Sequence, residues 1–65
     1  MPKYPITVDL CGVDGNAFCI LGHVLSSMRR AHIPQEERET FKKQATSGDY
    51  NHLIATCMDW VDIKI

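Results

Sequence analysis

The sequence lacks a long apolar run, an excess of charge of one sign and a set of cysteines that would suggest a disulfide framework. Without about 18 consecutive apolar residues, no transmembrane helix is predicted. The first residues also lack the apolar core of a signal peptide, so we expect the protein in the cytoplasm. Cys11, Cys19 and Cys57 are an odd number of thiols in a short chain, and we expect them to be reduced.

The charges are nearly balanced, with seven basic and eight acidic residues and a formal net charge of −1. A dominant role in nucleic-acid binding usually leaves an excess of basic residues, and this sequence has none. Repeats and linker-like segments are absent too, so the 65 residues predict one small domain spanning 1–65. A chain of this size buries only about 60% of its unfolded surface, and such chains often gain stability from a partner subunit.

The hydrophobic pattern predicts five elements. Alternation of apolar and polar residues indicates strands at about 6–11 and 61–65. Helical spacing indicates helices at about 16–32, 34–46 and 49–59. The fold class is therefore α+β, a β-α-α-α-β domain in which a two-stranded ribbon packs on three helices. No glycine or proline separates the last helix from the last strand, so we expect the chain to keep its direction there and the strands to be antiparallel. The ribbon leaves open edges, which predicts a homodimer through a strand edge.

Turn and helix-capping residues mark the ends of these elements. They are Gly12, Asp14, Gly15, Asn16, Gly48 and Asp49. The stretch GVDGN follows no phosphate-binding motif and carries an acid where a phosphate would lie, so it is interpreted as a turn and a cap. The apolar face of the first helix places Phe18 in the core, together with Ile20, Leu21 and Val24.

Cys19 and His23 lie four residues apart, which is usable spacing for metal ligands or for a thiolate pair. The helical wheel places both on the side opposite the apolar face, whereas Cys57 is central to the apolar face of the last helix. No orienting residue or oxyanion donor stands out. We therefore expect no catalytic residue, no metal and no cofactor.

Basic residues close the first two helices. Arg29, Arg30, Lys42 and Lys43 would form a small positive surface if these helix ends approach each other, and His23 lies on the same polar side of the first helix. The same placement also suits the negative ends of the helix dipoles. Trp60 lies where the last helix gives way to the last strand, and we expect it to be partly exposed and a candidate for partner contact.

Most of the chain follows one combined pattern, DGNAF, an RRA ending to the first helix, ATSGDYNHL and TCMxWV. In this pattern the sequence resembles a family of short, uncharacterised proteins of bacteria, phages and plasmids. The resemblance covers Val8, Leu10, Gly12, Asp14, Gly15, Asn16, Ala17, Phe18, Arg29, Arg30, Ala31, Gly48, Asp49, Tyr50, His52, Leu53, Cys57, Met58, Trp60 and Val61. Asn51 stands where such proteins commonly have Asp, and Cys19 where they commonly have a small residue. The resemblance implies a bacterial or phage protein of the cytoplasm and assigns no activity.

Taken together, these patterns predict a small binding or regulatory module that acts through protein–protein contacts. The alternative is a nucleic-acid-associated accessory protein that uses the small basic patch. Steeply salt-dependent binding of DNA or RNA would favour the alternative.

Overall fold

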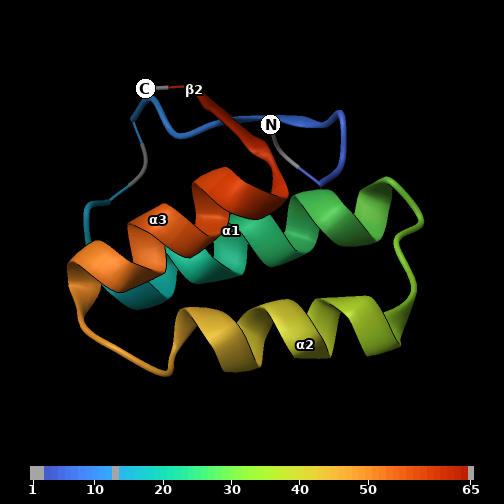
Figure 1. The fold of residues 1–65 in the computed structure, drawn as a ribbon. Coiled ribbons are helices and arrows are strands. Elements are labelled where there is room, and N and C mark those ends of the chain that lie inside the picture. The colour runs from blue at the N-terminus through green and yellow to red at the C-terminus, as the bar shows by residue number, and fades with distance from the viewer. Residues whose placement is uncertain (1–2, 13, 65) are drawn as a thin grey trace.

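The computed structural model describes residues 3–12 and 14–64 (Figure 1). In chain order its elements are β1 (Thr7–Asp9), α1 (Ala17–Arg30), α2 (Gln35–Ala45), α3 (Tyr50–Trp60) and β2 (Asp62–Lys64). The predicted α+β order of elements is confirmed, and the bounds lie within one or two residues of the predicted ones. The predicted end of the last strand, residue 65, lies outside the described residues. In the part of the chain that the structure describes, no helix combines the length and apolar composition needed to cross a membrane.

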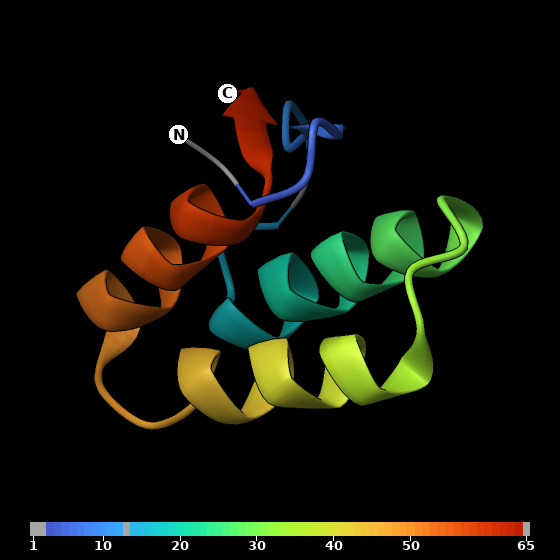
Figure 2. The ribbon, with the colours of Figure 1, turned by 45° about the vertical axis from the view of Figure 1, so that its right-hand side comes forward.

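The elements form three layers. α1 and α3 lie side by side and run in the same direction, and α2 packs under both of them in the opposite direction (Figures 1 and 2). The two strands cover the other side of α1 and α3. The core lies between these layers and consists of Val8, Ile20, Leu21, Val24, Met28, Ile33, Phe41, Ala45, Leu53, Cys57, Trp60 and Val61.

The two strands are parallel, so the prediction of an antiparallel ribbon is wrong. The prediction assumed that the chain keeps its direction after the last helix, but it turns sharply between α3 and β2 (Figure 1). Val61 has the extended backbone angles φ −139° and ψ 164°, and its N–H still donates to the carbonyl of Cys57 at 2.9 Å. Any residue adopts such angles, so the turn needs neither glycine nor proline.

The sheet has one apolar face and one polar face. Val8 pairs with Ile63, and both point toward the helices, Val8 fully buried and Ile63 partly buried. The side chains on the other face are exposed, namely Thr7, Asp9, Asp62 and Lys64. Because the sheet has only two strands among the described residues, each strand also has an outer edge without a partner.

Side-chain caps begin α1 and α3. The Asn16 side chain accepts the Phe18 N–H at 2.8 Å, and the Asp49 side chain accepts the His52 N–H at 2.9 Å. Asp14 lies two residues before Asn16, and its carboxylate accepts the N–H of Asn16 at 3.0 Å. These contacts satisfy backbone donors that a helix N-terminus leaves unpaired.

α1 ends earlier than predicted because His32 adopts a left-handed backbone, with φ 63°. The N–H of His32 donates to the carbonyl of Arg29, and the N–H of Ile33 donates to that of Met28. These two bonds form a Schellman motif, which commonly places glycine at the left-handed position. Ile33 and Met28 are both buried, so the motif turns the chain while keeping an apolar contact at the helix end.

Gly12 and Gly48 serve two different needs. Gly12 has φ 80° in the turn after β1, a conformation that favours glycine. Gly48 was expected to end the second helix, but α2 already ends at Ala45, and the backbone of Gly48 is not left-handed. A Cβ atom at Gly48 would lie 2.9 Å from the His52 side chain. Gly48 therefore provides room for His52, whose Nε2 lies 2.8 Å from the Gln44 carbonyl oxygen.

Candidate functional site

Two grooves lie on the surface of the helical layers, and they share no residue. The first, called the basic groove, runs between α1 and α2 and has a volume of about 400 Å³. It is lined by Leu25, Arg29, Gln35, Arg38, Glu39 and Lys42. The structure thus brings together two of the four predicted patch residues, Arg29 and Lys42. Their neighbours Arg30 and Lys43 do not line the groove, because consecutive helical residues point about 100° apart.

Arg38 is a cation of the basic groove that the sequence analysis missed. It is half-buried, and its Nε donates to the carbonyl oxygen of Ile33 at 3.2 Å. The spacing of four residues between Arg38 and Lys42 places both on one face of α2, and this spacing is the signal that could have found it. Among the residues that the structure describes, the ion pair that forms is between Lys3 and Glu37, neither of which lines the groove. Arg29, Arg38 and Lys42 therefore take part in no ion pair with the described residues.

The second groove, called the aromatic groove, lies at the other end of α1, where this helix meets the start of α3. Its volume is about 250 Å³. Its lining is Ala17, Phe18, Leu21, Ala45, Thr46, Gly48, Asp49, Tyr50 and Leu53. The side chain of Phe18 is 80% exposed and that of Tyr50 is 47% exposed. The Tyr50 hydroxyl donates to the carbonyl of Gly15 at 2.9 Å, which fixes its ring at the rim.

The expectation that Phe18 enters the core is wrong. The buried residues of α1 are Ile20, Leu21, Val24 and Met28. Phe18 lies roughly 100° round the helix from the middle of this face, at its edge rather than within it. The smaller Ala17 occupies the more central position in the first turn. Phe18, at the edge of the apolar face of α1, therefore lines the aromatic groove and not the core.

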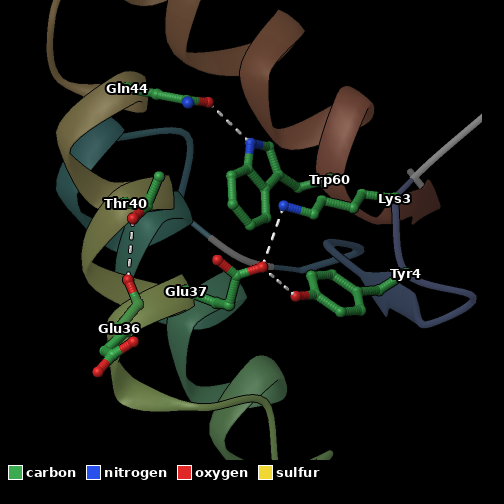
Figure 3. Close-up of polar contacts among 7 residues, drawn as sticks. All are labelled: Lys3, Tyr4, Glu36, Glu37, Thr40, Gln44 and Trp60. Atoms are coloured by element: carbon green, nitrogen blue, oxygen red, sulfur yellow. Dashed lines mark hydrogen bonds and ion pairs between the residues drawn. The ribbon is translucent and has the colours of Figure 1, made fainter.

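The expectation that Trp60 is partly exposed is also wrong, because only 5% of its surface is exposed. Its indole lies between α2 and the N-terminal segment, which here means Lys3 and Tyr4 (Figure 3). The ring packs edge-on against Phe41, with centroids 5.7 Å apart, and Lys3 Nζ lies 4.3 Å from its centroid. The indole N–H donates to the side-chain oxygen of Gln44 at 3.0 Å. Trp60 therefore anchors the core and is not available to a partner.

A polar clamp holds the N-terminal segment over Trp60 (Figure 3). The Tyr4 hydroxyl donates to Glu37 at 2.7 Å, and Lys3 Nζ lies 3.0 Å from the same carboxylate oxygen. These hydrogen bonds, from Tyr4 first and then Lys3, lower the pKa of Glu37. The bond to Glu37 raises the pKa of Tyr4. The backbone N–H groups of Lys3 and Tyr4 also donate to the carbonyls of Asp59 and Trp60, which end α3.

The thiols fall into two environments. Cys11 and Cys19 are exposed, whereas Cys57 is buried in the core, where desolvation raises its pKa to about 11. His23, on the same helix as Cys19, is half-buried. Across residues 3–12 and 14–64, no group of three or more His, Cys, Asp and Glu side chains could hold a metal ion.

Comparisons with known proteins leave these surfaces to be interpreted on their own geometry. No family model, no curated protein and no solved structure matches this chain.

Proposed function

We propose that the protein is a small cytoplasmic binding module that acts through protein–protein contacts, with the aromatic groove as its contact surface. The observation that supports this function most strongly is the 80% exposed side chain of Phe18 beside an apolar groove of about 250 Å³. A single exposed apolar residue is ordinary on a protein surface. An exposed aromatic ring that continues into an apolar groove is typical of a site that a partner covers.

The occupant that suits this groove is an apolar side chain of a partner protein. Its walls are mostly apolar, from Ala17 and Leu21 on one side to Leu53 on the other. Burying an apolar side chain there would remove both its surface and that of Phe18 from water, at about 25 cal/mol for each Å². Asp49 lies at the rim, but its carboxylate already accepts the His52 N–H.

A capture experiment tests this function. The tagged protein and two variants, Phe18→Ser and Met58→Ser, are used to recover proteins from the native host, and the recovered proteins are quantified by mass spectrometry. Met58 is a matched control because it is 58% exposed but does not line the groove. We expect a protein that the wild type and Met58→Ser recover and that Phe18→Ser does not. Recovery of the same proteins by Phe18→Ser would contradict the proposal.

Self-association through a strand edge remains a proposal of its own. It is supported by the unpaired outer edges of β1 and β2, which are only three residues each. Edges this short form few hydrogen bonds, so we expect a weak dimer. Sedimentation velocity over a range of protein concentrations measures it, and a sedimentation coefficient that stays at the monomer value would contradict it.

A further inference from the structure

We infer that the basic groove is a second binding site, which takes a carboxylate side chain from an acidic segment of a partner protein. This inference is independent of the function proposed for the aromatic groove. The two grooves lie at opposite ends of α1, one beside Ala17 and Leu21 and the other beside Leu25 and Arg29. Each can therefore be altered without changing the lining of the other.

The first argument is the charge of the groove. It is lined by three cations, Arg29, Arg38 and Lys42, and by one acid, Glu39, so three positive charges less one negative charge leave two positive charges. Glu39 accepts a hydrogen bond from the Gln35 side chain at 3.3 Å. None of the three cations forms an ion pair with any residue in 3–12 or 14–64. Like charges gathered from two helices repel one another, and an anion between them would offset that repulsion.

The second argument is the position of the Arg38 guanidinium. Its Nε donates to the carbonyl of Ile33 at 3.2 Å, which fixes one side of the planar group. Its terminal N–H groups have no hydrogen-bond partner among the described residues. A guanidinium held in this way loses less side-chain entropy when it binds a carboxylate. Arg29 on α1 supplies a second guanidinium on the facing wall of the groove.

The third argument is the apolar residue in the lining. Leu25 is partly buried and packs against the core, and it lies one turn before Arg29 on α1. A groove that combines cations with an aliphatic wall fits a side chain that has both a carboxylate and methylene groups. Glu is such a side chain, and an apolar neighbour in the same segment could contact Leu25.

The groove favours an acidic peptide over a nucleic acid. A nucleic-acid backbone needs a row of cations to neutralise successive phosphates. Here Arg30 and Lys43 do not line the groove, so its three cations do not extend into such a row. The whole chain has a formal net charge of −1, so no general positive field would attract a polyanion. A short acidic segment needs only the local cations.

Two double variants provide a matched test. Arg29→Gln/Lys42→Gln removes two cations from the groove, and Arg30→Gln/Lys43→Gln removes their sequence neighbours outside it. Each removes one Arg from α1 and one Lys from α2, so each lowers the net charge equally. Far-ultraviolet circular dichroism confirms that both variants fold. The probe is a fluorescently labelled short peptide of Glu, Leu and Ser, and its affinity is measured by anisotropy at low salt.

We expect the wild type and Arg30→Gln/Lys43→Gln to bind the peptide alike, and the groove variant to bind at least about tenfold more weakly, because it loses charge-assisted hydrogen bonds. The same peptide with Lys in place of Glu should not bind. Phe18→Ser should bind the Glu peptide normally, so failure here is distinct from failure of the aromatic groove. An equal loss in both double variants, no binding by the wild type, or tighter binding of a single-stranded oligonucleotide would each overturn the inference.

Discussion

Trp60 and Phe18 are aromatic residues near the ends of the two neighbouring helices, and they lie in opposite environments. Trp60 is the last residue of α3 and is 5% exposed, whereas Phe18 is the second residue of α1 and is 80% exposed. The N-terminal segment and α2 cover Trp60, and Gln44 accepts its indole N–H (Figure 3). Phe18 has no polar group to satisfy and lies beside an open groove.

The difference separates the stabilising end of the molecule from the end that we propose for binding. The polar contacts around Trp60 join residues distant in sequence, such as Tyr4 with Glu37, and they fix the fold. At Phe18 the exposed ring contributes little to the fold and remains available to a partner. Changes at the two ends should therefore affect stability very differently.

The largest expected effect is that of Trp60→Ala. Truncation of a buried tryptophan costs about 3–5 kcal/mol. A domain of this size has roughly 3–10 kcal/mol of stability in total, so the variant should be largely unfolded or close to it. Urea denaturation followed by circular dichroism measures this loss. Trp60→Phe keeps a ring in the core and should fold with a smaller loss. A Trp60→Ala variant within about 1 kcal/mol of the wild type would show that the covered end does not determine stability.

A smaller loss is expected for Gln44→Leu. The change removes the acceptor of the Trp60 indole N–H and should cost about 1 kcal/mol. Gln35→Leu is the matched control, since it makes the same change at an exposed position of α2 and removes only the exposed 3.3 Å hydrogen bond to Glu39. Urea denaturation compares the two. Equal stabilities would mean that the indole hydrogen bond adds nothing to the covered end.

The clamp at Glu37 should make stability depend on pH. The folded state lowers the pKa of Glu37, so this contribution is present above the unfolded pKa of about 4.5 and is lost as the pH falls through the folded pKa. We expect Glu37→Gln to be less stable than Glu36→Gln at neutral pH, and this difference to disappear in acid. Both residues lie in the first turn of α2, so the helix dipole affects them alike. Thermal melts at several pH values test this, and a difference that does not change with pH would contradict it.

On the alkaline side the raised pKa of Tyr4 acts in the opposite direction. The contribution of its hydroxyl is present below the unfolded pKa of 10.0 and is lost as the pH rises through the folded pKa.

The smallest expected effect on stability is that of Phe18→Ala. An exposed side chain contributes little, so the free energy of unfolding should change by less than about 0.5 kcal/mol. Phe41→Ala removes the same ring from a fully buried position and should cost about 3–5 kcal/mol. Urea denaturation compares the two variants. A large loss for Phe18→Ala would show that its ring supports the fold, and the contrast between the two ends would fail.

The sequence predicted the features that depend on periodicity and missed those that depend on how elements cover one another. Helical spacing located all three helices, because the buried residues of each helix, such as Leu21 and Val24 in α1, recur on one face of it. The direction of β2 depends on the extended backbone angles of Val61. The sequence has no glycine or proline at this turn, so the change of direction could not be predicted from it. The burial of Trp60 required the N-terminal segment to return to α3, a contact between distant parts of the chain.

The candidate grooves were predictable only in part. Arg29 and Lys42 lie near the C-terminal ends of their helices, but α1 and α2 run antiparallel, so these two ends do not meet. Both residues nevertheless line the groove between the helices, which the sequence does not reveal. Arg38 was overlooked because it lies among acidic residues in the sequence, although its spacing from Lys42 places it on the same face. The apolar side chain of Phe18 predicts a place in the core, but its position at the edge of the helical face leaves it exposed.

The pairing of Thr7 with Asp62 sets the order in which the domain can be completed during translation. β1 leaves the ribosome before any helix, but its partner strand is synthesised only after all three helices. Until then the apolar side chain of Val8 has no neighbouring strand, and closing so long a loop costs chain entropy that only the final contacts offset. A nascent chain that stops before β2 therefore exposes an unpaired strand to chaperones and proteases, whatever the state of its helices.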